Sequence, residues 1–372
     1  MLTSSSCQPR KIGDLETPAL IFDAVVVRRN IQRMADYGAQ SGLSIRPHYK
    51  THKSRLVGEL QLAAGAIGVT AAKVGEAETL SRPGDDLLLA YPPIGIARAT
   101  RLARLAGDRV VRAAVDTIAA VEEVSAAACS ADVTIGVMVD IDVGMGRTGV
   151  QSAKDSFALA AAIERSPGLR LDGIMIYPGH VWAAGDKQHG ALRAIAEKIE
   201  ESLHLWQRHG LQATIVSGGS TPTAYQSHLI PQLTEIRPGT YVYNDMNTVR
   251  GGFCSLSDCA ARIVTTVISD AVHGQVVIDA GSKTLAIDSC LPQLDSGYGH
   301  VVEYAEARIT RLSEEHGQID VRQCDRSPAV GERLTVIPNH ICPCVNLQNG
   351  AWWRESDDIV RALPIDARGM LQ

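Results

Sequence analysis

Residues 213–222 read ATIVSGGSTP, and residues 235–241 read EIRPGTY. Each stretch is a short apolar run that leads into glycine, hydroxyl or proline residues, a pattern typical of a β-strand followed by a turn that can bind an anion. In a (β/α)8 barrel, the loops after the seventh and eighth strands commonly hold a phosphate group. Counted from the N-terminus, these two runs are the seventh and eighth expected strands.

Six earlier runs of the same kind lie at residues 44–50, 67–71, 86–90, 110–115, 134–140 and 171–177. Segments with helical periodicity separate them, for example residues 117–128, 153–165 and 190–209. Eight strands that each feed a helix predict an α/β fold of the closed (β/α)8, TIM-like type. An open doubly wound sheet would show the same alternation, but the strand count and the position of the two phosphate loops favour the barrel.

After Gly251 the pattern changes to short strands joined by glycine and aspartate turns. The expected strands cover residues 262–268, 275–279, 301–309 and 333–338, and residues 17–23 are expected to pair with the same sheet. We therefore expect a barrel over residues 20–250 and a mostly β domain over residues 1–19 and 251–372.

The composition excludes several classes of protein. The 372 residues carry 36 Lys and Arg against 41 Asp and Glu, so bulk charge provides no means of holding nucleic acid or an anionic membrane. No apolar run approaches the roughly 20 residues that span a bilayer, and the polar N-terminus lacks the apolar part of a signal peptide. A cytoplasmic location is expected, in which the eight cysteines stay reduced.

The segment RPHYKTHK, residues 46–53, ends the first expected strand, where a barrel places its active site. Lys50 is surrounded in the sequence by His48, His52 and Lys53. Cationic neighbours lower the pKa of a buried lysine and make it a nucleophile that can form a Schiff base. The alternative is a solvated lysine on a loop, which this segment alone would favour.

Three more candidates stand at the ends of the fifth and sixth strands. Arg147 lies in GMGRTG, residues 144–149, where it is either a cation directed at the barrel mouth or a partner for a nearby aspartate. The glycine spacing there does not open a dinucleotide-binding βαβ unit, so NAD is excluded. Tyr177 and His180, in YPGH, can hydrogen-bond or move protons, although structural residues would look the same.

A last candidate pair is His340 and Cys342 in the β domain. On a strand, residues two apart point to one face, which suits two ligands of a borderline or soft metal ion. Two ligands make a weak site, and a buried cysteine beside a histidine is the simpler interpretation. An open metal site of this kind makes sense when substrate and water complete the coordination shell.

Taken together, these motifs resemble the alanine racemase-like, or fold type III, pyridoxal phosphate enzymes, within them the D-threonine aldolase and D-serine dehydratase group. The resemblance covers nearly the whole chain. It implies that Lys50 binds the cofactor covalently and that His340 and Cys342 hold a divalent metal. It also implies a cofactor site that includes Arg147, Tyr177, Ser217, Gly218, Gly219, Ser220, Thr221, Gly239, Thr240 and Tyr241, with Lys50, Tyr177 and His180 as catalytic residues.

The resemblance implies a lyase that acts on a D-3-hydroxy amino acid. Retro-aldol cleavage to glycine and an aldehyde is the first expectation, and a D-serine or D-3-hydroxyaspartate dehydratase is the second. A racemase, for which Tyr298 could supply an opposing base, and a non-catalytic cofactor carrier are further alternatives. The residue two after the metal-binding histidine is usually aspartate in D-threonine aldolases, whereas Cys342 matches the zinc-dependent D-serine dehydratases; manganese or magnesium is the alternative metal. The resemblance also implies a homodimer.

Overall fold

The computed structural model describes residues 8–291, 293–356 and 358–372. The chain divides into two compact units. The first, called here the β unit, comprises Met1–Gln32, Thr51–Ser54 and Thr240–Gly369. The second, the barrel unit, comprises Arg33–Lys50, Arg55–Gly239 and Met370–Gln372.

The barrel unit is built on eight parallel strands. In sheet order they are β3 (Ser44–Ile45), β10 (Glu235–Ile236), β9 (Ile215–Gly218), β8 (Leu169–Ile176), β7 (Ile135–Ile141), β6 (Val110–Val115), β5 (Asp86–Leu89) and β4 (Val69–Ala71). A parallel bridge between His48 and Thr70 joins the two ends of this sheet, and the amide of Tyr49 donates to the carbonyl of Thr70 at 2.8 Å. The sheet is therefore closed, and the predicted barrel is confirmed.

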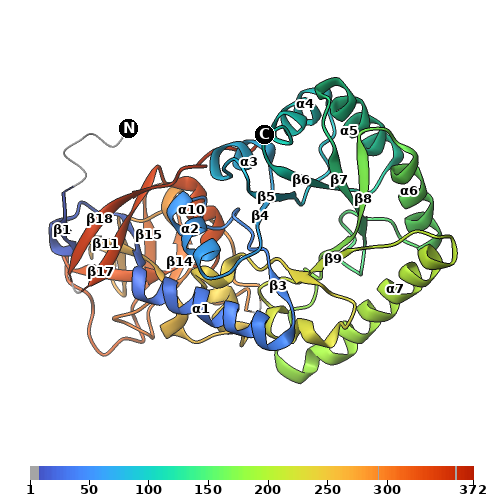
Figure 1. Ribbon diagram of the computed structural model, residues 1–372. Helices are drawn as coiled ribbons and strands as arrows, with labels where there is room; N and C mark the ends of the chain where they lie inside the picture. The colour runs from blue at the N-terminus through green and yellow to red at the C-terminus, as the bar shows by residue number, and fades with distance from the viewer. Residues whose placement is uncertain (1–7, 292, 357) are drawn as a thin grey trace. The chain divides into compact units, whose positions relative to one another are not determined.

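Helices follow the strands and surround them, as Figure 1 shows for α4 to α7. They are α1 (Ala24–Ser41), which begins in the β unit, and α2 (Arg55–Ala63), α3 (Val74–Leu80), α4 (Ile96–Leu105), α5 (Ile118–Ala131), α6 (Ala153–Arg165) and α7 (His189–Arg208). Side-chain caps define the start of two of them: Thr117 accepts from the amide of Ala120 before α5, and Ser152 accepts from that of Asp155 before α6.

Strands β3 and β10 are shorter than the sequence pattern predicted. Each has two residues, whereas the expected strands covered residues 44–50 and 235–241. Pro47 and Pro238 explain the difference, because proline has no amide hydrogen to donate to a strand ladder. Beyond Pro47 the sheet continues only through isolated contacts, the bridge between His48 and Thr70 and a hydrogen bond from the amide of His48 to the carbonyl of Pro238, so neither strand extends past its proline.

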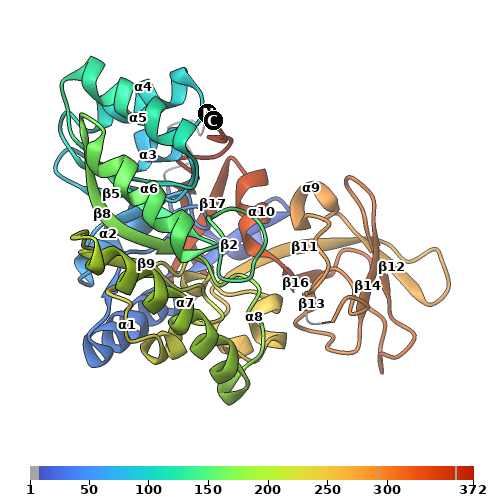
Figure 2. The same ribbon diagram turned by 90° about the vertical axis from the view of Figure 1, so that its right-hand side faces the viewer.

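The β unit contains the remaining strands. Its main sheet has the order β1 (Arg10–Lys11), β18 (Ile359–Pro364), β17 (Gly350–Ser356), β2 (Ala19–Asp23), β11 (Ala261–Ser269), β12 (Gln275–Ile278), β15 (Gly317–Asp320) and β14 (Arg308–Leu312). Strand β16 (Arg333–Ile337) pairs with β11 and with β13 (His300–Val301), as can be followed in Figure 2. The predicted pairing of the N-terminal strand is confirmed, because β2 lies antiparallel to β11 and parallel to β17.

One predicted strand of this unit is wrong. Residues 301–309 were expected to form a single strand, but they divide into β13 and β14. A tight turn separates the two, in which the amide of Ala307 donates to the carbonyl of Tyr304 at 2.9 Å.

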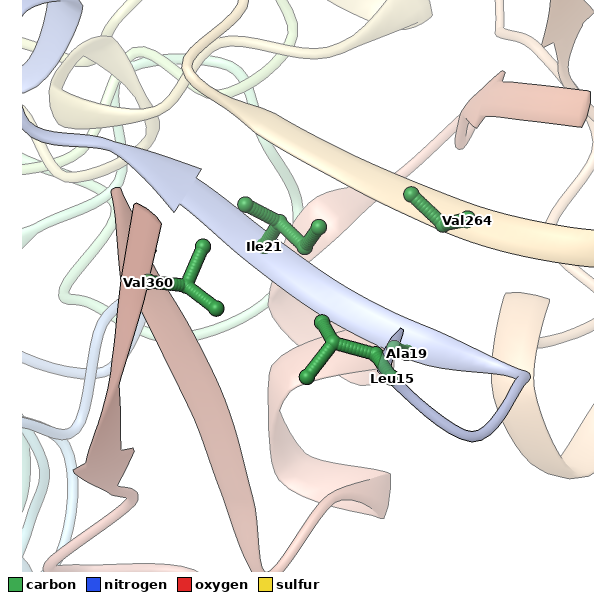
Figure 3. Close-up of a cluster of buried hydrophobic side chains, with 5 residues drawn as sticks. All are labelled: Leu15, Ala19, Ile21, Val264 and Val360. Carbon is green, nitrogen blue, oxygen red and sulfur yellow. The ribbon is translucent and has the colours of Figure 1, made fainter. Parts of the chain in front are cut away.

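A cluster of buried apolar side chains from distant parts of the sequence holds the β unit together. Leu15, Ala19 and Ile21 contact Val264 of β11 and Val360 of β18, as Figure 3 shows. Residues 15–21 and the strands β11 and β18 thus share one core. Among the described residues, no helix has the length and apolar character needed to span a membrane.

Candidate functional site

Lys50, Tyr177 and Arg147 come together in the barrel unit. They follow β3, β8 and β7 respectively, and so lie beyond the carboxyl ends of their strands. The Nζ atom of Lys50 is 5.7 Å from the centre of the Tyr177 ring, and the guanidinium carbon of Arg147 is 4.7 Å from it. Both cations therefore face the same ring at the barrel mouth.

Two glycines fix the side chains that follow β8. A Cβ atom at Gly179 would lie 2.2 Å from the ring of Tyr177, so only glycine leaves room for that ring. A Cβ atom at Gly144 would lie 2.9 Å from Nε2 of His180, and Gly144 also has a positive φ of 122°. His180 is exposed and packs against the loop that carries Arg147.

Carboxylates hold that loop in place. Asp142 accepts hydrogen bonds from the amides of Gly144 and Gly146, both at 3.0 Å. Thr148 donates to Asp140 at 2.9 Å. Burial raises the pKa of Asp140 to about 6, although the Thr148 hydroxyl and nearby arginines oppose the rise. The loop is thus shaped by contacts other than an ion pair at Arg147, which leaves that cation over the Tyr177 ring.

The predicted phosphate loop begins with an anchoring serine, Ser217, which two glycines follow. Ser217 is buried; its hydroxyl donates to Glu235 at 2.6 Å and accepts from Arg237 at 2.5 Å, so it anchors the loop to the barrel interior. A Cβ atom at Gly218 would lie 2.7 Å from Leu233, and Gly219 has a φ of 77°. Glycine is required at both positions, because the backbone packs closely at the first and is left-handed at the second.

The loop then turns back on itself. The amide of Ser220 donates to the hydroxyl of Thr223 at 3.0 Å, and the two hydroxyls are 3.1 Å apart. Thr221, between them, is half-buried. Such a glycine and hydroxyl turn at the end of a strand has the donors that a phosphate group needs.

A buried ionic network lies beneath this loop and was not foreseen from the sequence. Arg46 contacts Glu235 at 3.0 Å and Asp86 at 2.6 Å. Burial lowers the pKa of Arg237 to about 10 even though Glu235 and Asp140 oppose that change. Charged residues inside expected strands were the available signal, since a charge in a barrel interior must be paired.

Gly239 is the last residue of the second stretch in the barrel unit, whereas Thr240 and Tyr241 belong to the β unit. They form a 3-10 turn (Thr240–Val242) in which Tyr241 is buried. The hydroxyl of Thr240 lies 3.7 Å from the sulfur of Cys342. Within the β unit, this turn therefore adjoins the expected metal ligands.

His340 and Cys342 do not lie on a strand, so that prediction is wrong. Strand β16 ends at Ile337, and helix α10 (Ile341–Leu347) begins three residues after Pro338 with His340 as its N-cap. Pro343 explains the helix: amides in a first helical turn have no partner within the helix, so proline is tolerated there. The two side chains nevertheless meet, because they share a hydrogen bond.

The surroundings of His340 and Cys342 suit two ligands of one metal ion. Nδ1 of His340 is 2.5 Å from a carboxylate oxygen of Asp288, which fixes the ring and leaves Nε2 for another contact. Burial lowers the pKa of His340, but Cys342, Asp245 and Asp288 outweigh it and raise the pKa to about 10. Burial likewise raises the pKa of Cys342, but His340 and the Thr51 hydroxyl, 3.2 Å from the sulfur, lower it overall. The lowered pKa favours the thiolate, which is the form that binds metals.

Asp245 is hydrogen-bonded to the backbone between His340 and Cys342. No feature of the sequence identified it as part of this site. Asp245 is buried, caps helix α8 (Met246–Arg250), and accepts from the amide of Ile341 at 3.1 Å. Burial raises its pKa, against the opposing effect of His340. Neither Asp245 nor Asp288 has a sequence spacing that ties it to residue 340.

Among the described residues, no three His, Cys, Asp or Glu side chains form a group that could hold a metal ion. The donors at residues 340 and 342, one nitrogen and one thiolate with a carboxylate behind the nitrogen, fit an open site that other ligands complete. The residues at the barrel mouth also fit pyridoxal phosphate: a lysine amine, an arginine, an aromatic ring and a glycine turn are the groups that its aldehyde, ring and phosphate require.

Comparison with known families agrees with this geometry. The family model for the N-terminal domain of alanine racemase matches residues 23–247. The chain belongs to this family. A second model, a putative serine dehydratase domain, matches residues 260–351 of this alanine racemase-like protein. The expected class, a pyridoxal phosphate-dependent lyase of fold type III, is confirmed.

Individual relatives cover almost the full length. The alanine racemase-like chain is 31% identical over 370 residues to 3-hydroxy-D-aspartate aldolase of Paracoccus denitrificans, which covers 96% of this chain and 93% of that one. It is 32% identical to D-threo-3-hydroxyaspartate dehydratase of Delftia sp. strain HT23, and the match covers 88% of this chain and 91% of that one. The crystal structure of D-threonine aldolase from Filomicrobium marinum superposes with a TM-score of 0.89 at 28% identity over 98% of both chains.

Structures of variants are known for the D-threo-3-hydroxyaspartate dehydratase. In one a histidine is replaced by alanine, and in another a cysteine two positions later is replaced by alanine, in a metal-free form. The second superposes with a TM-score of 0.85 at 29% identity over 95% of this chain and 98% of that one. The spacing of those two residues equals that of His340 and Cys342.

Proposed function

We propose that this protein is a pyridoxal phosphate- and divalent metal-dependent lyase that dehydrates a D-3-hydroxy amino acid to a 2-oxo acid and ammonia. The observation that carries the proposal is the contact of His340 with Cys342, backed by Asp288. A thiolate and an imidazole suit zinc, whereas the resemblance implies aspartate at the second position in D-threonine aldolases. Manganese and magnesium remain the alternative metals.

We assign the cofactor site to the barrel mouth, with Lys50 as the covalent attachment point. When bound, pyridoxal phosphate accepts the electrons of the bond that breaks at the α-carbon of the substrate. The cation of Arg147 and the ring of Tyr177 would contact the pyridine ring of the cofactor, and the turn from Gly218 to Thr221 would provide backbone donors for its phosphate. Gly239, Thr240 and Tyr241 stay predicted cofactor residues. Ser217 holds this turn to the barrel interior through Glu235 and Arg237.

Two side chains have roles in moving protons, Lys50 and His180, and Tyr177 positions the first of them. The amine of Lys50 would act as the base that takes up the proton of the substrate α-carbon. Tyr177 keeps this amine in position, since the Nζ atom lies over its ring. His180, exposed beside Gly144, is able to exchange protons with the departing groups of the substrate.

His340 and Cys342, the proposed metal ligands, serve the step at the β-hydroxyl of the substrate. They would hold the divalent metal, which when bound would supply the Lewis acidity that polarises the bond from carbon to this hydroxyl. His340 is oriented for this task by Asp288, and Cys342 by the hydroxyls of Thr51 and Thr240. Thr51 follows Lys50 directly in the sequence, so one peptide bond links the proposed lysine base to the residue that contacts the thiolate.

Retro-aldol cleavage to glycine and an aldehyde is the second candidate. The similarity to 3-hydroxy-D-aspartate aldolase and to the D-threonine aldolase structure favours it. The same groups would serve, with the metal lowering the pKa of the hydroxyl so that the bond between the α- and β-carbons breaks.

Product analysis separates the two candidates. The purified protein, supplied with pyridoxal phosphate and zinc, is incubated with D-serine, D-threonine and D-threo-3-hydroxyaspartate. Dehydration releases ammonia and a 2-oxo acid in equal amounts, whereas aldol cleavage releases glycine and an aldehyde. Glycine as the main product from the last two substrates would overturn the dehydratase proposal. Loss of optical activity without either product would instead indicate a racemase, and bound cofactor with no turnover a carrier. A homodimer is the expected assembly, which light scattering in solution tests.

A further inference from the structure

Two cysteines outside the proposed site face each other in the β unit. Cys254 is half-buried and Cys259 is completely buried, and both are free thiols. Their side chains share a hydrogen bond. A buried thiol that contacts a partly exposed one is the arrangement found in dithiols that exchange with disulfides.

The local fold brings these two residues together. A single 3-10 turn (Leu256–Asp258) lies between them, and a capping box between Ser255 and Asp258 closes it. The amide of Cys259 donates back to the carbonyl of Leu256 at 3.2 Å. The chain therefore reverses between positions 254 and 259, so that their side chains meet.

The two thiols differ in reactivity. Hydrogen bonds from Cys259 and Thr248 lower the pKa of Cys254, although burial and the carboxylates of Asp258 and Asp245 oppose this. The contact with Cys254, followed by burial, raises the pKa of Cys259. Cys254 is thus the nucleophile that solvent can reach, and Cys259 is the thiol that resolves the first product.

We propose that Cys254 and Cys259 form a reversible intramolecular disulfide, with a small-molecule disulfide such as oxidised glutathione as the oxidant. The sulfur of Cys254 attacks one sulfur of the oxidant, whose S–S bond breaks and releases one thiolate. The sulfur of Cys259 then attacks the sulfur of Cys254, releasing the second thiolate, and the two leaving groups take up the protons of the two cysteines. Two electrons pass from the protein to the oxidant, which becomes two thiols.

A chain of hydrogen bonds connects Cys254 with the segment that carries His340 and Cys342. A disulfide bond is about 2.05 Å long, so the two sulfurs must move closer than they are as thiols, and this changes the position of Cys254 relative to Thr248, with which it shares a hydrogen bond. Thr248 and Asp245 form the capping box of α8. Asp245 in turn accepts from the amide of Ile341, between the two proposed metal ligands.

The start of α8 also pairs with the chain that leads into these ligands. The amides of Met246 and Asn247 donate to the carbonyls of Pro338 and Asn339, both at 3.0 Å. Met246 packs with Cys259 and Ile337 in one buried cluster. We therefore expect oxidation at Cys259 to weaken the contacts that hold residues 338–342.

The test equilibrates the full-length holoenzyme in glutathione buffers of increasing oxidised fraction and maps its cysteines by mass spectrometry. The expected product is a peptide pair linked between Cys254 and Cys259, with a mass lower by two hydrogen atoms and fully reversed by dithiothreitol. Cys259→Ser should stall with glutathione attached at Cys254, and Cys254→Ser should form neither product. Cys129, an exposed thiol of the barrel unit, is the reference for ordinary reactivity.

Hydrogen exchange on the linked form provides a readout that does not depend on catalysis. Amides of residues 246–250 and 341–342 should exchange severalfold faster in the linked protein than in the reduced one, and Cys254→Ser should not respond to the oxidant. Cys254 modified no faster than Cys129, or no link before the protein unfolds, would overturn the proposal. A link that leaves exchange unchanged would overturn its connection to the site.

Discussion

Replacing Asp288 by asparagine removes the negative charge that faces the ring of His340 while keeping the size of the side chain. Its carboxylate is 2.5 Å from Nδ1 of His340. A carboxylate behind a metal-binding histidine raises the basicity of the ring, and its loss typically weakens metal binding 10- to 100-fold, or about 1.4–2.7 kcal/mol. We expect a decrease in zinc affinity of this size.

The same substitution should hardly affect folding. The His340 and Asp288 side chains are 39% and 42% exposed, and ion pairs as exposed as this contribute less than about 1 kcal/mol. We therefore expect Asp288→Asn to lower zinc affinity by at least tenfold and to leave the free energy of unfolding nearly unchanged.

Competition with a coloured zinc chelator measures the affinity, and urea denaturation of the metal-free protein measures the stability. Asp295→Asn is the matched control, since Asp295 is exposed on the chain segment that follows Asp288. Equal zinc affinity in the wild type and in Asp288→Asn would refute the role given to this carboxylate. A loss of several kcal/mol in stability would show that Asp288 is structural instead.

Four further outcomes are expected. Lys50→Ala should abolish the visible absorbance of bound cofactor, and a remaining band would place the attachment at another lysine. Cys342→Ala should remove the metal and most activity but leave the cofactor absorbance, whereas unchanged metal content would argue against ligation. The pKa of Asp140 is raised from 3.8 to about 6, so the folded state binds more protons and the free energy of unfolding should fall as pH rises across that window; Asp140→Asn should flatten this slope in urea titrations. Gly173→Ala should lower stability by about 3 kcal/mol or more, because its Cβ would lie 1.9 Å from the carbonyl oxygen of Ile215; a near-neutral effect in urea denaturation would mean that β8 can shift.

The barrel was predictable because each of its units is local. Helix α6 begins and ends where its periodicity does, at Ala153 and Arg165, since a serine cap precedes it and an apolar stripe runs along it. The pairing of the N-terminal strand followed from its position ahead of the first barrel strand, which leaves it to the other sheet. The short strands β3 and β10 were overextended, because the prolines that end their ladders were not taken into account. The domain boundaries at residues 20 and 250 stay predictions.

The sequence predicted those site residues that follow barrel strands, and it did not predict those that only the tertiary fold brings together. Lys50, Arg147 and Tyr177 each follow an apolar strand, so the barrel rule was enough to group them. Asp245 and Asp288 reach His340 only through the tertiary fold, and no periodicity or spacing marks them. Cys342 was placed on a strand because its alternation with His340 was taken as the signal, whereas residues 341–347 form helix α10, whose first turn tolerates Pro343.

The strand β2, which contributes Ala19 and Ile21 to the core of the β unit, has consequences for the order in which the protein forms during synthesis. Its partners β11 and β17 begin at Ala261 and Gly350, so β2 leaves the ribosome more than two hundred residues before either of them. All eight barrel strands are complete by Ile236, earlier than both partners. Since domains generally fold as units during translation, the barrel is free to fold first while the N-terminal strand stays exposed. An unpaired apolar strand is a site for aggregation, so nascent chains that stop between Ile236 and Ala261 are the ones for which chaperone binding should be strongest.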